Sequence, residues 1–289
     1  MCIIKEASYP ALFQAADSAS IESQNKFFLY LRSYLIILIL AAFFAYLWPD
    51  SQLGAISAAF LFLVSLFLLV AMKVEKPDEI WYNGRAVAES VKTISWKWMM
   101  HAQPYQKEND EQNFILDLKK ILNQNCHLSS ILPAVTENQV AITEDMKKVR
   151  DMVTDDRKQL YLKERIEDQQ KWYSKKSQDL QNKVKQWFWL SVTLHVIAIF
   201  LLLLRIKAYK YQFPIEVIST VASAILTWLQ AKKFNELSAA YSHTAHEIAF
   251  IVSEADSVSS ETELSNYVVN SETAFSREHT QWCARRVIY

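Results

Sequence analysis

Glycine is nearly absent from this chain of 289 residues, which contains only Gly54 and Gly84. A loop that cradles phosphate groups needs several glycines close together, so the sequence excludes a phosphate-binding loop of the usual glycine-rich kind. Proline is also sparse. Pro49 and Pro214 mark two expected turns, and neither glycine nor proline occurs in residues 134–213. Because these two residue types are the strongest helix breakers, the sequence predicts long, unbroken helices.

Cysteine and net charge are low as well. The three cysteines, Cys2, Cys126 and Cys283, are widely spaced, which indicates a reducing compartment without a disulfide framework or a metal site. Basic and acidic side chains balance to a formal net charge of +0, so nucleic acid is not expected as a partner. The sequence shows no nucleophile with a suitable base and no metal-spaced cluster. We therefore expect neither an enzyme nor a cofactor.

Four apolar segments, grouped as two hairpins far apart in the chain, dominate what the sequence does contain. Each is about the length needed to cross a hydrocarbon core of roughly 30 Å at about 1.5 Å per residue. The sequence therefore predicts an all-α membrane protein, a bundle of four transmembrane helices with a long-helix cytosolic body, and we expect it to be oligomeric. The four expected spans are residues 33–48, 53–72, 187–204 and 213–231.

Basic residues flank the hairpins more densely than they occupy the turns. The first turn has no lysine or arginine, whereas the second contains Arg205, Lys207 and Lys210, which weakens the contrast. The positive-inside rule still places both termini and the middle of the chain in the cytoplasm.

One expected helix links the body to the membrane. The stretch that begins at Thr154 has an N-cap residue and an acidic first turn, and it has no breaker before Gln186. It predicts a stalk of roughly 50 Å, at about 1.5 Å per residue, that continues into the third span. We expect the fourth span to extend past Tyr241 in the same way.

The two halves look like a diverged duplication. Gln24-Asn-Lys before the first span recurs as Gln181-Asn-Lys before the third, and the segment 82–89 pairs with 241–247. We expect a first two-span unit over residues 1–105, a helical linker over 106–153 and a second two-span unit over 154–289. A heptad-like spacing also predicts a helix-packing seam, which consists of Trp81, Gly84, Ala88, Val91, Ser95 and Trp98.

Three stretches resemble the SLATT family of bacterial membrane effectors, namely PDEIWYNGRAVAESVKTISWKWMM, YLKERIEDQQKWYSKKS and SETAFSREHTQWCARR. SLATT proteins are two-span domains associated with nucleotide-signalling and conflict systems, and this chain resembles two such units in tandem. The resemblance implies an oligomeric protein of the bacterial inner membrane that forms a pore or disrupts the membrane during an anti-phage response. Its trigger would be a nucleotide second messenger or a separate sensor protein, since no nucleotide-generating or nucleotide-sensing domain is visible.

Polar residues recur on one face of the fourth span, and these are Glu216, Thr220, Ser223, Thr227 and Gln230. This face is either the lining of a pore or a helix–helix contact rich in small hydroxyl residues. Glu216 also fits a helix start, because it follows Pro214 by two residues. His195, deep in the third span, either marks a pathway or is a neutral imidazole bonded to Ser191 or to a neighbouring helix.

Charged and aromatic residues outside the spans are the candidates for gating, ligand binding or packing. They are Trp81, Tyr82, Arg85, Glu89, Trp172, Tyr173, Arg277, Glu278, His279, Trp282, Arg285 and Arg286. The terminal arginines either lock the last helix onto the body or bind a phosphorylated signal, since guanidinium forks suit phosphate oxygens.

The function that we expect is an oligomeric membrane effector whose cytosolic helices gate a pore. The alternative is a non-conducting membrane anchor that recruits a cytosolic partner through its stalk. Membrane lipid and further copies of the chain are the expected partners in the first case.

Overall fold

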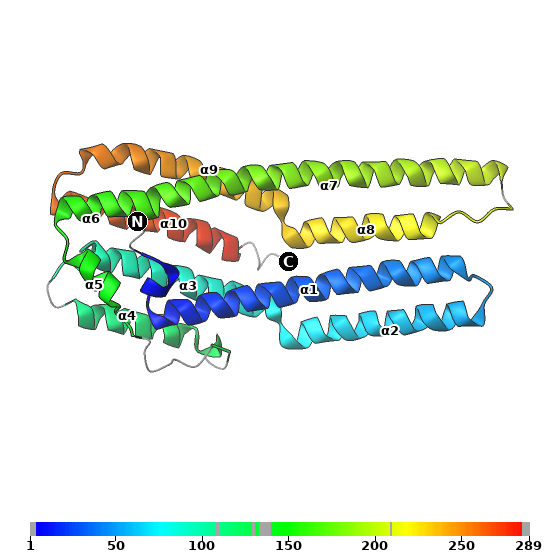
Figure 1. The fold of residues 1–289 in the computed structure, drawn as a ribbon, viewed down its shortest axis with the longest axis horizontal. Helices are drawn as coiled ribbons and strands as arrows, with labels where there is room; N and C mark the ends of the chain where they lie inside the picture. The colour runs from blue at the N-terminus through cyan, green and yellow to red at the C-terminus, as the bar shows by residue number, and fades with distance from the viewer. Residues whose placement is uncertain (1–3, 108–109, 129–130, 133–139, 209, 285–289) are drawn as a thin grey trace. The chain divides into compact units, whose positions relative to one another are not determined.

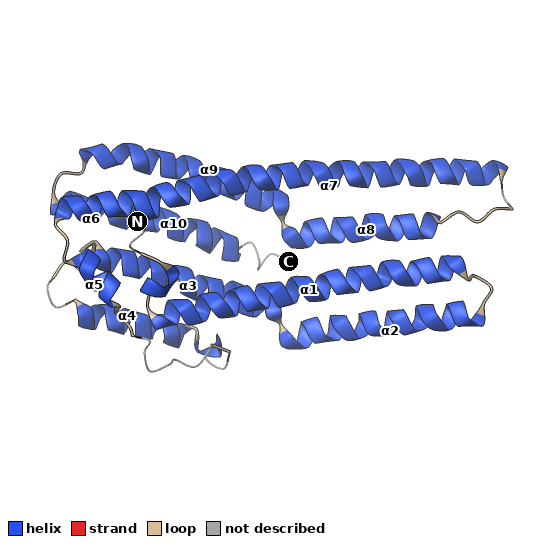
Figure 2. Cartoon of the chain, viewed as in Figure 1, coloured by secondary structure: helices blue, strands red, loops and turns tan. Residues whose placement is uncertain are grey.

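A computed structural model describes residues 4–107, 110–128, 131–132, 140–208 and 210–284, without the side chains of His127 and of residues 277–284. Within these ranges every regular element is a helix (Figure 2), which confirms the all-α class. The chain divides into two compact units. We call them the body (residues 1–24, 78–176 and 240–289) and the membrane unit (residues 25–77 and 177–239).

Two antiparallel hairpins form the membrane unit (Figure 1). They are built from helices α1 (Ala11–Leu47) and α2 (Gln52–Glu75), and from α7 (Asp168–Lys207) and α8 (Ile215–Lys232). The Tyr46 hydroxyl donates to the Gln212 carbonyl at 3.3 Å, close to both turns. At the other end the Phe28 and Trp228 rings meet with centroids 5.7 Å apart. Both turns therefore lie at the same end of the unit, so the two hairpins run in the same direction.

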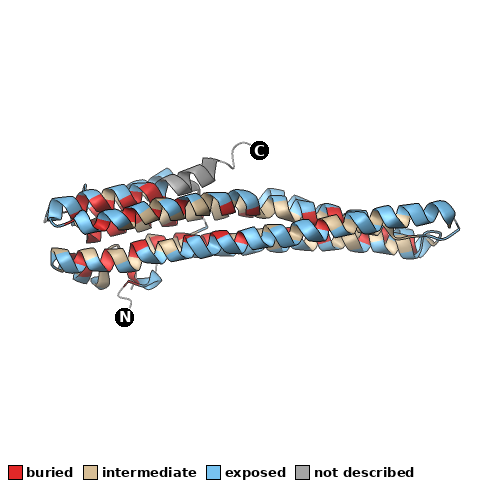
Figure 3. Cartoon of the chain, turned by 90° about the horizontal axis from the view of Figure 1, so that it is seen from above, coloured by how far each residue is buried: buried red, intermediate tan, exposed pale blue. Residues whose placement is uncertain are grey.

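Three helices in the described part of the chain are long and apolar enough to cross a bilayer. They lie within the helical stretches Ala11–Leu47, Gln52–Met99 and Thr154–Lys207, and in their most apolar windows only 17 %, 6 % and 0 % of residues are buried. Figure 3 shows the same contrast, since buried residues are concentrated in the body helices. Helix α8 has 18 residues and is not among these three, because Glu216, Lys232 and a row of hydroxyl residues make it more polar. The predicted fourth span stays a prediction.

The two halves repeat at a constant distance along the chain. The Ser20 hydroxyl donates to the Trp81 carbonyl at 3.0 Å, and the Ser177 hydroxyl donates to the Ser238 carbonyl at 3.0 Å. Ser177 follows Ser20 by 157 positions, and Ser238 follows Trp81 by the same 157. This register also shows that the predicted pairing of segments 82–89 and 241–247 is wrong by two residues, because Tyr241 corresponds to Gly84.

The same register appears where each hairpin ends. Lys76 and Lys233 both adopt the left-handed conformation, with φ of 47°, and a new helix begins directly after each. These helices are α3 (Pro77–Met99) and α9 (Phe234–Glu254). The prediction that the fourth span continues unbroken past Tyr241 is therefore wrong. Pro77, directly after Lys76, marks the first break, whereas neither glycine nor proline stands beside Lys233.

The remaining helices belong to the body. They are α4 (Glu111–Gln124), α5 (Glu144–Arg150), α6 (Thr154–Tyr161), a π-helical turn η3 (Leu162–Glu167) and α10 (Glu261–Ala284), with short turns η1 (Glu6–Ser8), η2 (Cys126–Leu128) and η4 (Ala255–Ser257). The predicted seam on α3 is buried from Gly84 to Trp98, with Val91 and Ser95 fully enclosed, while Trp81 is half-buried. The stalk is helical from Thr154 onward as predicted, although its N-cap is Val153.

Candidate functional site

The outer surface of α8 is mostly polar, although Leu226 is also exposed on it. Glu216, Ser223, Thr227 and Gln230 are exposed and Thr220 is half-buried. The opposite face packs into the membrane unit, where Ala222 and Ile225 are buried. The predicted polar face therefore points away from the chain's own helices. If α8 spans the membrane, this face contacts lipid, water or another protein chain.

Hydroxyl groups on this face are bonded within their own helix. Thr220 donates to the Glu216 carbonyl at 2.7 Å, and Thr227 donates to the Ser223 carbonyl at 3.0 Å. Such bonds satisfy the hydroxyl donors and leave the oxygen lone pairs directed outward. The face can thus accept hydrogen bonds from water or from another helix without rearrangement.

The repeat register shows what stands on the same face of α2. Counting back 157 positions from Glu216, Thr220, Ser223, Thr227 and Gln230 gives Ala59, Leu63, Leu66, Val70 and Lys73. All five are exposed on α2. Two helices of one architecture therefore present the same surface, apolar at the first four of these positions in α2 and polar at all five in α8.

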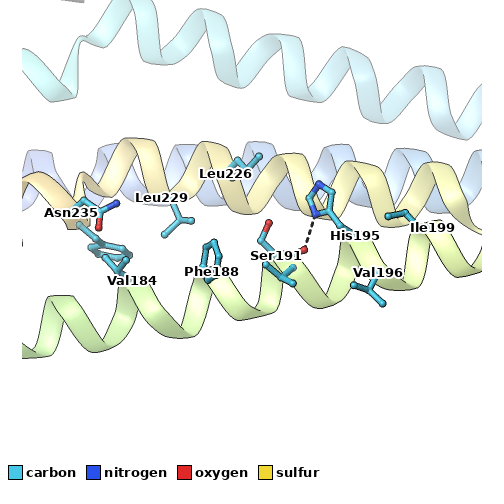
Figure 4. Close-up of a pocket in the computed structure, with 11 residues that line it drawn as sticks. Val184, Phe188, Ser191, His195, Val196, Ile199, Leu226, Leu229 and Asn235 are labelled. Atoms are coloured by element: carbon cyan, nitrogen blue, oxygen red, sulfur yellow. Dashed lines mark hydrogen bonds between the residues drawn. The ribbon is translucent and has the colours of Figure 1, made fainter.

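His195 lies on α7 at the edge of a pocket of about 410 Å³ between α7 and α8 (Figure 4). Its Nδ1 lies 2.7 Å from the Ser191 carbonyl oxygen. Because a carbonyl only accepts, Nδ1 is the donor in this hydrogen bond. The walls include Phe188, Ile199 and Leu229. This geometry matches the predicted bond to residue 191, and the acceptor is the main-chain oxygen.

A bidentate ion pair occupies the core of the body. Arg165 on η3 donates from Nε and Nη2 to the two oxygens of Glu272 on α10, at 2.9 and 2.8 Å. Tyr161 and Thr93 each donate a hydroxyl to the same carboxylate at 3.0 Å. Arg165 is 2 % exposed and Glu272 is 0 % exposed. Burial opposes the charge on Arg165, but Glu272 raises the pKa of Arg165 above its ordinary value, so the guanidinium stays protonated.

A second group of charged side chains, more exposed to solvent than Arg165 and Glu272, lies beside this ion pair. Arg85 and Glu89 on α3 form an ion pair at 2.8 Å, and Asp17 on α1 lies near enough to act on Arg85. Burial disfavours the charged form of Arg85, yet Glu89 holds its pKa above the ordinary value. Burial and the positive charge of Arg165 together lower the pKa of Lys92. Positive and negative side chains thus lie next to one another in the body. A ligand or a movement that separated them would leave a buried charge without its counter-charge, which is costly.

The predicted aromatic residues fall into two groups. Trp172 and Tyr173 meet edge to face, and both contact Tyr241 on α9, with centroids 5.3 and 5.4 Å away. Trp81 packs on Tyr82 at 4.8 Å. Tyr173 and Tyr241 also act electrostatically on Arg85, so the structure brings part of the predicted gating set together.

The predicted terminal cluster lies outside what the structure describes. The side chains of Arg277, Glu278, His279 and Trp282 are not described, and neither are residues 285–289, which include Arg285 and Arg286. Among the described residues, no group of three or more histidine, cysteine or acidic side chains could hold a metal ion.

Sequence reasoning missed Arg165 and Glu272, although both lie in stretches with a family resemblance. The two residues are 107 positions apart, and neither has a local pattern that distinguishes it from a solvated charge. The only signal was their presence in YLKERIEDQQ and SETAFSREHT.

Comparison with known families fits this arrangement of two similar hairpin units. Residues 10–158 match the model described as SMODS and SLOG-associating 2TM effector domain 3, and residues 161–282 match SMODS and SLOG-associating 2TM effector domain 1. The chain belongs to the SLATT family. It is a tandem SLATT membrane effector, as the resemblance implied. No curated protein and no solved structure matches the chain.

Proposed function

We propose that this tandem SLATT protein assembles in the bacterial inner membrane and lets ions cross it, with α8 lining the path. The observation that carries the proposal is the contrast between α2 and α8. Positions 63, 66 and 70 of α2 are leucine, leucine and valine, whereas their counterparts on α8 are Thr220, Ser223 and Thr227. Both sets are on the outward side of their helices.

Lipid is a poor solvent for the α8 face. Hydrocarbon cannot hydrogen-bond to the outward lone pairs of the hydroxyls. Further copies of the chain, arranged with α8 inward, would give this face water while the apolar face of α2 meets lipid. Four helices enclose little lumen, so the proposal requires an oligomer.

The body would control opening. Helix α7 contributes residues to both units, so it is the covalent route from the ion pair on η3 to the second hairpin. We place both termini in the cytoplasm, where a nucleotide messenger or a sensor protein could act on the body during phage infection. No chemical step is assigned to the protein, because its proposed output is loss of the ion gradient.

The test is conductance across a planar bilayer that contains the purified full chain. The variant Thr220→Leu, Ser223→Leu, Thr227→Val gives α8 the residues that α2 carries at the same register. We expect discrete openings in the wild type and none in the variant, with an unchanged oligomer size. The control is Thr193→Leu on α7, because Thr193 is an exposed, back-bonded hydroxyl on another helix of the same unit.

Loss of openings in both variants would show that hydroxyl removal damages the protein in general. Openings that persist in the α8 variant would move the lining elsewhere, with His195 the next residue to change. A strictly monomeric protein in lipid that never conducts, even with its activator, would favour the membrane scaffold. Changes at Trp172 and Tyr173 should then impair function before any change in α8.

A further inference from the structure

The polar face of α8 carries charge of one sign. Helix α8 contains two charged residues, Glu216 in its first turn and Lys232 at its end. Glu216 is exposed and stands on the same face as Thr220 and Ser223. Lys232 points to the opposite side of the helix, because the positions between them turn it by roughly 160° at about 100° per residue. Its ammonium lies 3.2 Å from the centroid of the Phe28 ring on α1, so the cation of α8 faces the chain's own first hairpin.

The Glu216 carboxylate takes no part in holding the described chain together. An acidic side chain in a first turn often caps free main-chain N–H groups. Within the described residues no donor bonds to this carboxylate, and Ser219 and Thr220 donate instead to the Glu216 main-chain carbonyl. In the same part of the chain the carboxylate also pairs with none of the cations near the turn, which are Arg205, Lys207 and Lys210. It is therefore available on the outward face.

Hydroxyl groups beside Glu216 present oxygen to the outside. Ser219, Thr220 and Thr227 each donate their hydroxyl hydrogen to a main-chain carbonyl of α8, at 2.7–3.0 Å. Their lone pairs remain, so the face offers hydrogen-bond acceptors along its length. The N-terminus of α8 adds a partial positive charge of about +0.5, which one carboxylate more than offsets. This chemistry suits a cation better than an anion.

The first copy of the repeat has none of these groups. At the same register α2 carries Ala59, Phe62 and Leu63 in place of Glu216, Ser219 and Thr220, and all three are exposed. The carboxylate and its neighbouring hydroxyls are thus a feature of the second hairpin alone.

We propose, on the basis of the proposed function, that the path lined by α8 selects cations and that Glu216 determines this selectivity. In an assembly with α8 inward, every copy places one Glu216 carboxylate at the same depth, close to the turn of the second hairpin. The carboxylates then form a ring at the mouth of the path. Acidic rings of this kind favour cations, whereas rings of lysine or arginine favour anions.

The ratio of K⁺ to Cl⁻ permeability tests this proposal. It is obtained from the reversal potential of openings in a planar bilayer that contains the full chain under a KCl gradient. The wild type should favour K⁺ by a factor on the order of ten, as expected for close charges at a partly wet site. Glu216→Gln should bring the ratio to about one while openings persist, and Glu216→Asp should keep the preference because it keeps the charge. The matched control is Asp50→Asn, which removes an exposed carboxylate from the turn of the first hairpin and should leave the ratio unchanged.

This measurement distinguishes failure of the selectivity from failure of the pore. Absence of openings in the wild type would overturn conduction, and the selectivity with it. Openings that prefer Cl⁻, or a K⁺ preference that survives in Glu216→Gln, would leave the pore intact and overturn the role of Glu216. A Cl⁻ preference would instead assign the mouth to the cations near the turn. The wild-type ratio needs no substitution, so it decides the sign of the selectivity whether or not Glu216→Gln assembles.

Discussion

Replacement of Glu272 by glutamine should destabilise the body severely. The Glu272 carboxylate accepts four hydrogen bonds, two from Arg165 and one each from Tyr161 and Thr93. Glutamine has almost the same shape, but it carries no charge, and its amide nitrogen must face donors. Breaking a buried ion pair by removing one partner costs about 3–5 kcal/mol. A domain of this size should therefore melt on the order of 10 °C lower.

Urea or thermal unfolding of the full chain in detergent, followed by tryptophan fluorescence, measures this change. Trp96 and Trp98 are fully buried in the body and report on its packing. The matched control is Glu167→Gln, which neutralises one member of the exposed Lys171–Glu167 pair. That pair is on the surface, so its loss should cost less than about 1 kcal/mol.

A double-mutant cycle decides whether the effect belongs to the pair. Arg165→Met combined with Glu272→Leu should be several kcal/mol less destabilising than the sum of the two single changes, because the double variant buries no uncompensated charge. Additivity within about 0.5 kcal/mol would refute the reasoning. A loss below about 1 kcal/mol for Glu272→Gln would do the same.

Two further predictions concern the body. A Cβ on Gly84 would lie 3.0 Å from the Ala16 carbonyl oxygen, so Gly84→Ala should lower the melting temperature even though alanine favours helix by about 1 kcal/mol, whereas Ser90→Ala on the exposed side of α3 should not lower it. Burial and the nearby Arg150 charge lower the pKa of His101 below its ordinary 6.5. As the pH falls, His101 in the unfolded chain therefore takes up its proton at a higher pH than His101 in the folded chain. The contribution of neutral His101 to the free energy of unfolding is complete above pH 6.5 and is lost as the pH falls below it. Melting temperatures at pH 7.5 and 5.5 should differ less in His101→Asn, and an unchanged difference would contradict the assignment.

Hydrophobicity and helix breakers predicted the parts of the fold that depend on local sequence. The turns at Pro49 and Pro214, the stalk that leads into α7 and the buried seam on α3 all follow from patterns within a few turns of helix. Burial of Val91 and Ser95 was predictable because a spacing of three and four residues places them on one face.

Features that depend on distant contacts could not be predicted. Lys233 ends its helix in a conformation that lysine rarely adopts and has no glycine or proline beside it, so no residue type marks that break, whereas Pro77 marks the break at Lys76. Arg165 and Glu272 are identified only when α10 packs against η3, since each one alone reads as a solvated charge. The polarity of the α8 face was visible in the sequence, but its outward direction requires the neighbouring helices.

Comparison of the two copies of the internal repeat distinguishes the contacts that the fold requires from the features that only the second copy has. Contacts that hold the helices together are kept in both copies, as in the hydroxyl bonds of Ser20 and Ser177. Even the crossing of α1 and α3 is preserved in a changed form, since the close contact of Ala16 with Gly84 becomes the Tyr173–Tyr241 ring contact at the same register.

The outer surface of the second hairpin, in contrast to these internal contacts, differs from that of the first. A mostly apolar outer face on α2 has become mostly polar on α8. Hydroxyl groups or a carboxylate do not stabilise a helix whose outer face contacts only hydrocarbon, because hydrocarbon offers them no hydrogen bonds. Because these changes lie on outward positions and the internal bonds are retained, the first hairpin has the surface of a structural support. Under the proposed function, the second hairpin supplies the surface that meets water or further copies of the chain.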